Sequence, residues 1–226
     1  VLRYGGEAQY TAWWKGKLAW SSPTVQKAAK KFAEVALTPG NVNGGGKAIA
    51  ATGFGATANL FATDKNKCFM MRQGSFITDF FPDAVKAEYK ANNFTRVGVF
   101  KLPAPAGTTD AVLGGGDLAA AFDANPATQK VLNFILSDKL GTGAMLATYP
   151  SYLSAHKTFP SAGYKNPITK NIAGILSTAK LFGFDGSDLA PAVVNATEWT
   201  ELTNWIAGKK TQKQAFDAID ASWKKA

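Results

Sequence analysis

The chain has 226 residues, of which 46% are hydrophobic and 18% are charged. Such a composition can bury a core, so it excludes an intrinsically disordered chain and a disulfide-stapled miniprotein, and no apolar run approaches the roughly 18 to 20 residues that span a bilayer. The 25 basic side chains outnumber the 16 acidic ones by nine, but the lysines are spread along the chain and only three arginines are present, so nucleic-acid binding is the less favoured alternative.

Three helices are predicted from the residues at their beginnings. Ser22 followed by Pro23 provides a capping side chain and a fixed φ ahead of an apolar series that ends before Pro39. Asparagine followed by proline gives the same signal twice more, at Asn125 and at Asn166. Apolar residues at helical spacing follow each pair, so the sequence predicts a helix after each of them.

The last part of the chain is predicted to be helical, and short strands are predicted upstream of it. A helix is expected over Asn195–Ile206, and Thr211 with Gln214 forms a capping box for a final helix. Short apolar runs bounded by glycine or proline predict strands at Cys68–Met71, Arg96–Leu102 and Leu118–Phe122. Helices that alternate with short buried strands indicate an α/β fold.

Two punctuated segments, Pro103–Gly107 and Thr148–Tyr152, interrupt the predicted elements. They suggest points where the chain crosses between structural bodies, so the segment between them is expected to belong to a different body from its flanks. That segment begins near Gly114–Gly116, which Asp117 follows. Consecutive glycines let the backbone approach a ligand or bend at a hinge, and a plain turn is the alternative.

The sequence contains few residues arranged as nucleophilic, metal-binding or cofactor-binding motifs require. Gly53–Ala58 matches the spacing of a dinucleotide-binding loop, but the segment about 20 positions on, Cys68–Gln73, holds no carboxylate, which favours a Gly/Ala-rich loop. His156 is the single histidine and Cys68 the single cysteine, so an HExxH site and a cysteine cluster are excluded. We expect no metal and no cofactor. Carboxylates from distant segments can still meet, so an enzyme acting on glycans stays an alternative.

Aromatic residues stand beside polar residues at several places. They include Trp13 and Trp14 near the start, Phe76 after Gly74-Ser75, and Trp199 after Glu198. Sugar recognition uses this combination, because an aromatic ring covers the apolar C–H face of a pyranose while polar groups bind its hydroxyls. The alternative for each tryptophan is a place in the core.

Several stretches, in this order and spacing along nearly the whole chain, make the sequence similar to a known family. The chain resembles the carbohydrate-binding extracellular solute-binding proteins of bacterial ABC importers, the maltose-binding-protein-like group, and most closely its α-glucoside-type members. The stretches are Trp14–Pro23, Asn59–Thr63 with Cys68–Phe76, Val97–Pro103, Gly114–Asp117, Phe184–Pro191, Glu198-Trp199 and Ala221–Trp223. Cys68, Phe76 and Gly186 depart from the residues usual in the family, which concerns the sugar rather than the fold.

The resemblance implies an α/β fold of the type II periplasmic-binding-protein class, with helices around a short-stranded sheet, and it matches the C-terminal half of the family's two-lobed proteins. Residues 1–104 would begin the second lobe, 105–160 would cross the hinge into the first lobe, and 161–226 would return to the second. It implies a monomer that is not an enzyme, that binds a mono- or oligosaccharide in an interlobe cleft and that delivers it to membrane permease subunits. It also implies an extracellular or periplasmic location, with a lipoprotein anchor upstream.

The resemblance and the aromatic pattern together nominate ligand-binding residues. Phe76 and Trp199 are expected to stack on the sugar, and Trp13 or Trp14 is a weaker candidate. Gly115 and Gly116 would offer backbone N–H groups and Asp117 a carboxylate for hydroxyls. Two further residues, Arg72 and Glu198, are expected to be either ligand contacts or members of structural ion pairs.

Overall fold

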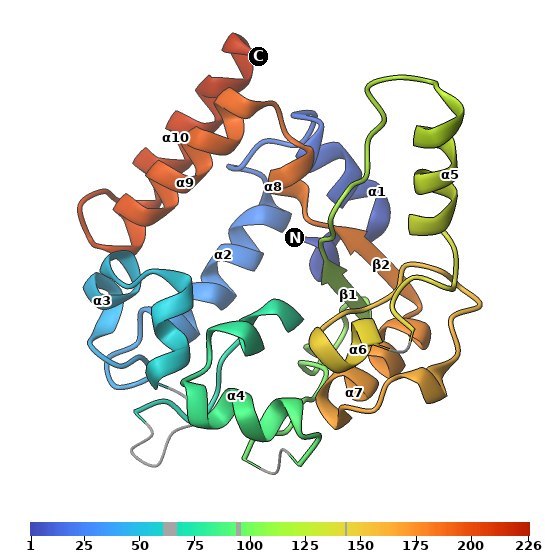
Figure 1. Ribbon diagram of the computed structural model, residues 1–226. Helices are drawn as coiled ribbons and strands as arrows, with labels where there is room; N and C mark the ends of the chain where they lie inside the picture. The colour runs from blue at the N-terminus through green and yellow to red at the C-terminus, as the bar shows by residue number, and fades with distance from the viewer. Residues whose placement is uncertain (61–66, 94–95, 143) are drawn as a thin grey trace. The chain divides into compact units, whose positions relative to one another are not determined.

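The computed structural model describes residues 1–60, 67–93, 96–142 and 144–226. Helices predominate, and the described residues contain one small sheet (Figure 1). The chain divides into two compact units. The first consists of Val1–Phe54, Leu102–Gly114 and Ala179–Ala226, and the second of Gly55–Lys101 and Gly115–Thr178. The division into residues 1–104, 105–160 and 161–226 stays a prediction.

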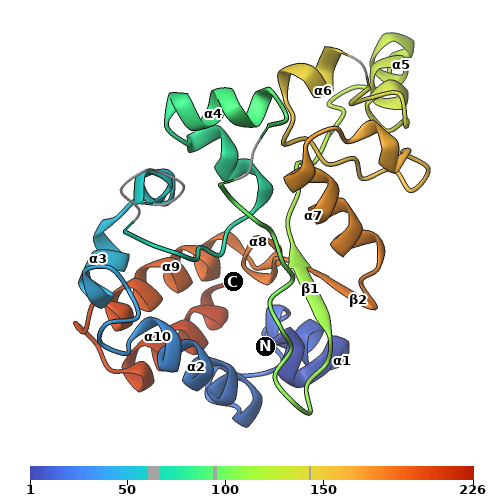
Figure 2. The ribbon, with the colours of Figure 1, turned by 90° about the horizontal axis from the view of Figure 1, so that it is seen from below.

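The first unit combines a two-stranded parallel sheet with helices. Strand β1 pairs with β2 in a register that runs from Ala111 opposite Leu181 to Gly114 opposite Phe184. Helices α9 and α10 lie side by side in both ribbon views (Figures 1 and 2). The elements are α1 (Leu2–Trp14), α2 (Pro23–Ala36), α3 (Gly45–Ala51), β1 (Ala111–Gly114), β2 (Leu181–Phe184), α8 (Gly186–Leu189), α9 (Ala192–Ile206), α10 (Gln212–Ser222) and the 3-10 turn η4 (Trp223–Lys225).

The core of the first unit forms around α10. Phe216 is 1% exposed, and its ring centroid lies 5.0 Å from that of Trp20 and 5.7 Å from that of Trp205. Val194 and Ile219 are fully buried in the same cluster. Apolar residues spaced three or four apart on α10 face this cluster. The capping box fixes where the helix begins, and the buried apolar face holds it against the core.

The second unit is built from short helices and turns. Its core cluster contains Ala58, Ile77, Phe81, Val85, Tyr89 and Ile168. The elements are η1 (Phe54–Leu60), which begins at the boundary, η2 (Ser75–Phe80), α4 (Asp83–Lys90), α5 (Pro126–Ile135), α6 (Ala144–Thr148), η3 (Ser161–Gly163) and α7 (Pro167–Ser177).

The predicted helix starts are confirmed. Helices α2, α5 and α7 each begin at the expected proline, and α10 follows the capping box of Thr211 and Gln214. The side chains of Asn125 and Asn166 accept hydrogen bonds from the first backbone N–H groups of their helices. Ser22 occupies the N-cap position, but its hydroxyl makes no capping hydrogen bond. Helix α9 begins three residues before the predicted Asn195.

The three predicted strands are wrong. Cys68–Met71, Arg96–Leu102 and Leu118–Phe122 carry no strand pairing in the structure. Several of their bulky apolar residues face solvent, with Phe69 89% exposed, Leu118 87% and Phe122 fully exposed, while Met71, Val97 and Val99 pack against the core cluster of the second unit without forming strands. Short apolar runs do not become strands without a neighbouring strand to pair with. The strands that do form, β1 and β2, are only four residues long and contain glycine, and the predicted Gly53–Ala58 loop is mostly the 3-10 helix η1.

Asn166 joins two elements of the second unit, and its replacement tests that role. Its Oδ1 accepts from the backbone N–H of Ile168 at 3.0 Å, and its Nδ2 donates to the carbonyl of Tyr89 at 2.8 Å, with Asn166 2% exposed. Asn166→Ala removes a cap and one of the two hydrogen bonds that the Tyr89 carbonyl accepts, the other coming from the backbone N–H of Asn92, so we expect the free energy of unfolding to fall by about 2 kcal/mol.

Asn125→Ala provides the matched control. Asn125 caps α5 in the same way, with 2.9 Å bonds from Ala127 and Thr128, but it is exposed. Urea unfolding is expected to show a loss of about 1 kcal/mol or less for this variant. Equal losses for the two variants would show that the Tyr89 bond contributes nothing.

Candidate functional site

Trp199 lies on the open face of α9. Its side chain is 68% exposed, whereas Val194, Glu198 and Glu201 form the buried stripe of the same helix. The exposed stripe around Trp199 consists of small side chains at helical spacing: Ala192, Ala196, Thr200 and Thr203. The indole is therefore the one large side chain on this stripe, and its face is accessible to a planar or ring-shaped ligand.

Trp13 and Trp14 occupy more enclosed positions on α1. The ring of Trp13 lies 5.6 Å from that of Tyr10 and 5.4 Å from that of Trp20, and Trp13 packs against the core cluster of the first unit. Trp14 is half-buried, and Lys15 Nζ stands 5.0 Å from the centre of its ring. This packing favours the core interpretation for Trp13 and leaves Trp14 as the weaker ligand candidate.

The second unit carries the other predicted ligand residues. Phe76 is 47% exposed on η2, directly after the Gly74-Ser75 turn. Arg72 and Asp117 are exposed, as are Gly115 and Gly116. A Cβ added to Gly116 would meet nothing within 4 Å, so the backbone there is open to approach. Residues 61–63 of the family-like stretch Asn59–Thr63 lie outside the described residues.

Glu198 is neither an exposed ligand contact nor a member of an ion pair within the described ranges. It is 6% exposed on the inner face of α9. Burial, with a smaller contribution from Asp185, raises the pKa of the Glu198 carboxyl from the ordinary 4.5 to about 7. The other buried acid of α9, Glu201, does have a cation, with its Oε2 2.6 Å from Lys210 Nζ.

The surroundings of Glu198 include groups that the sequence did not single out as a set. The hydroxyl of Tyr10 donates to the carbonyl of Phe184 at 2.6 Å, and burial, as the main cause, raises its pKa to about 12. Asp185 accepts from the backbone N–H of Ser187 and caps α8. A Cβ on Gly186 would stand 2.6 Å from Trp13 Cζ3, so only glycine allows α8 to approach α1 this closely. In the sequence, the family-like stretch Phe184–Pro191 was the one feature that pointed to this set of groups.

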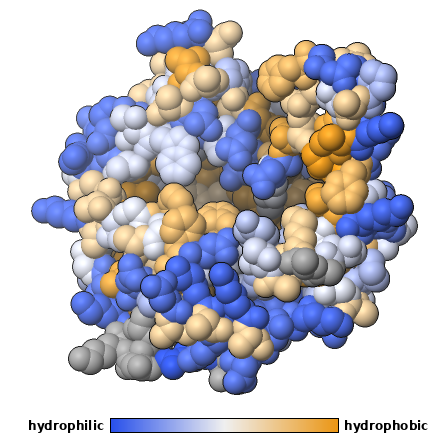
Figure 3. Space-filling view, in the orientation of Figure 1, coloured by the Kyte–Doolittle hydropathy of each residue, from blue (hydrophilic) through white to orange (hydrophobic). Residues whose placement is uncertain are grey.

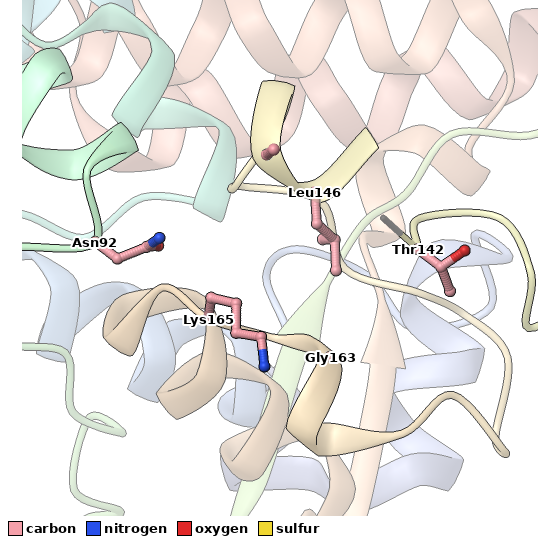
Figure 4. A pocket seen from close by; sticks show the side chains of 6 residues that line it. Asn92, Thr142, Leu146, Gly163 and Lys165 are labelled. Carbon is pink, nitrogen blue, oxygen red and sulfur yellow. The ribbon is translucent and has the colours of Figure 1, made fainter. Parts of the chain in front are cut away.

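A separate pocket of about 260 Å³ lies in the second unit (Figure 4). Asn92, Thr142, Leu146, Ala147, Gly163 and Lys165 line it. Leu146 points from α6 into the space between Lys165 and Thr142. None of the predicted ligand residues lines this pocket.

Among residues 1–60, 67–93, 96–142 and 144–226, no group of three or more His, Cys, Asp or Glu side chains is placed to hold a metal ion. None of the described helices combines the length and apolarity needed to cross a membrane.

Comparison with known proteins relates the chain to larger binding proteins. No family model matches it. It is 28% identical over 225 residues to the osmoprotective compounds-binding protein GgtB of Synechocystis sp., covering 99% of this chain and 51% of that protein. It is 29% identical over 224 residues to the alpha-glucosides-binding periplasmic protein AglE of Rhizobium meliloti, covering 99% and 48%.

These similarities confirm the resemblance to solute-binding proteins along nearly the whole chain. The chain spans about half the length of the curated relatives it matches. Both relatives are named as binding proteins, and neither name describes an enzyme.

Proposed function

We propose that this chain is the C-terminal half of a carbohydrate-binding solute-binding protein that serves an ABC importer and changes no covalent bond of its ligand. The observation that carries the proposal is the match of nearly the whole chain to about half of a protein named for binding alpha-glucosides. The relative named for osmoprotective compounds supports a binding role of the same kind.

Trp199 is the proposed sugar platform of the first unit. A pyranose presents one face of C–H bonds, and an accessible indole covers that face while the ring hydroxyls remain free to bind polar groups. The 68% exposure of Trp199 and the small side chains around it supply such a surface. Replacing a largely exposed side chain changes the free energy of unfolding by about 0.5 kcal/mol or less, so the effect of Trp199 on binding can be separated from its effect on folding.

Phe76 is the proposed aromatic contact of the second unit. It is less exposed than Trp199, and its phenyl ring offers a smaller face than an indole. Arg72 and Asp117 carry exposed charged groups suited to sugar hydroxyls, and Gly115 and Gly116 would add backbone N–H donors. Each of these residues is proposed as a ligand contact.

The proposed fold is the type II periplasmic-binding-protein class, in which residues 105–160 belong to a lobe completed by the other half of the protein. The surface of α5 supports this division. None of its residues is buried, and Val131 is 57% exposed, Phe134 53% and the adjacent Leu136 66%. Figure 3 shows hydrophobic side chains gathered over this region. An amphipathic helix with an uncovered apolar face is expected to pack against further protein.

The proposed partners and location follow from the same relationship. The loaded protein would present its sugar to membrane permease subunits outside the cytoplasm, as a monomer held by a lipoprotein anchor. The relative from Rhizobium meliloti is named as periplasmic, which supports an exported protein. The net charge of +9 gives no separate argument for nucleic acid, because basic residues occur in both units.

The experiment is a titration of the chain with maltose-type and other oligosaccharides, followed by tryptophan fluorescence and by chromatography of the sugar. We expect a saturable fluorescence change without new products. Because the chain supplies half of the proposed binding protein, the dissociation constant is expected to be about 1 mM or weaker, or about −4 kcal/mol. New sugar products would contradict the proposal and favour a glycan-acting enzyme, and no response up to tens of millimolar of every sugar would also contradict it.

A further inference from the structure

We propose that Glu198 is a positioning residue for Trp199, and that its carboxyl, Asp185 and the Tyr10 hydroxyl form a proton-holding junction of α1, α8 and α9 whose deprotonation loosens α9. The role of Glu198 in positioning Trp199 rests on the proposed function, whereas the junction of α1, α8 and α9 does not depend on any ligand.

Glu198 lies on the face of α9 that packs against the rest of the first unit. Glu198 is 6% exposed and one residue from the most exposed tryptophan of the chain. Helix α9 contacts α8, and α8 contacts α1. At Gly186, α8 comes close to α1, since a Cβ added there would stand 2.6 Å from Trp13 Cζ3 and 3.0 Å from the Tyr10 hydroxyl oxygen. The rotation of α9 that buries Glu198 is the rotation that turns Trp199 outward.

The charges around Glu198 are acidic. Besides burial, Asp185, the N-cap of α8, raises the pKa of the Glu198 carboxyl, and the charges of Asp185, Glu198 and Asp188 raise the pKa of Tyr10 on α1. The neighbouring acid Glu201 on α9 is neutralised by Lys210. Helix α10 uses its charged groups elsewhere: Lys213 pairs with Asp217, and Asp220 accepts from the backbone N–H of Trp20. Lys47 of α3 is exposed. Lys224 and Lys225 of η4, which also contacts α9, are exposed, and no described lysine or arginine forms an ion pair with Glu198.

The pH dependence follows from this arrangement. An unfolded chain releases the Glu198 proton near pH 4.5, whereas burial and Asp185 hold the proton in the folded chain to about pH 7. The folded state therefore binds more protons than the unfolded state between these values. The stability contributed by the protonated group is lost as pH rises from about 4.5 to about 7, which is the opposite of an ordinary paired carboxylate.

The test compares the wild-type chain with Glu198→Gln, which mimics the protonated acid, and with Glu201→Gln as the matched control. Urea unfolding is measured from pH 5 to pH 8.5. We expect the unfolding equilibrium constant of the wild type to rise about tenfold or more across this range. The rise should disappear in Glu198→Gln and persist in Glu201→Gln. The same pH profile in wild type and Glu198→Gln would overturn the junction.

Two further measurements test the junction and the positioning of Trp199 separately. If Glu198→Gln does not fold, carbon-13 NMR of the wild-type glutamate carboxyls decides, since one signal must titrate near pH 7 and its absence overturns the junction. The fluorescence response to maltose at pH 5.5 and pH 8 tests the positioning of Trp199. A response that weakens at pH 8 in wild type but not in Glu198→Gln supports it. An equal response at both pH values overturns that positioning role alone, and no response at either pH overturns it together with the proposed function.

Discussion

Replacing Trp199 by alanine is expected to abolish the response of the chain to maltose-type sugars while leaving its stability within about 0.5 kcal/mol of wild type. The indole is 68% exposed, so its removal opens no cavity. A sugar that covers about half of the ring loses roughly 2 kcal/mol of apolar burial, or more than tenfold in affinity. Nuclear magnetic resonance titration of the sugar signals measures binding without depending on the deleted fluorophore.

Val193→Ala is the matched control for this variant. Val193 lies on the same helix and is 39% exposed, but it is an aliphatic side chain that offers no ring face. Its removal is expected to change sugar affinity less than twofold. A Trp199→Ala chain that binds sugar as wild type does would show that Trp199 is not a platform.

Replacing Phe216 by alanine is expected to lower the free energy of unfolding by about 3 to 5 kcal/mol. Phe216 is 1% exposed and contacts the rings of Trp20 and Trp205, so alanine leaves a cavity between α10, α9 and the segment before α2. The loss includes the transfer of the phenyl ring, the cavity and the two edge-to-face aromatic pairs. Urea unfolding followed by circular dichroism measures it.

Phe122→Ala serves as the control, because the side chain of Phe122 is fully exposed and supports no packing in this chain. Its effect on the free energy of unfolding is expected to stay below about 0.5 kcal/mol. A loss below about 1 kcal/mol for Phe216→Ala would mean that the cluster around α10 is not the core of the first unit.

Helix beginnings were predictable because their cause is local. The side chains of Asn125, Asn166 and Thr211 bond to backbone groups two or three residues away, so a short stretch of sequence contains the whole interaction. Helix α1 was not predicted, because it contains Gly5 and Gly6 and bends at Gly6, whose φ is 65°. The strands were not predictable, because pairing Ala111 with Leu181 depends on residues 70 positions apart.

The candidate site was only partly predictable, because α9 departs from the usual hydrophobic pattern at three positions, although Val194, Leu202 and Trp205 pack in the core as expected. Its buried stripe contains Glu198 and Glu201, while Trp199 faces outward. In an amphipathic helix, tryptophan is expected on the buried face and glutamate on the exposed face. Trp199 was predicted as a ligand contact from its place in a family-like stretch, and the structure shows that its side chain is exposed. The burial of Glu198 beside Asp185 required the fold, since 13 residues and a turn between helices separate them.

The indole N–H signal of Trp199 tests most directly whether the chain binds a carbohydrate without altering it. In a two-dimensional NMR titration with maltose-type sugars, that signal, assigned by its loss in Trp199→Phe, should shift with a saturable dependence while the sugar spectrum shows no new species. A Trp199 signal that stays fixed up to tens of millimolar of every sugar, or a sugar that is cleaved during the titration, would contradict the proposed function.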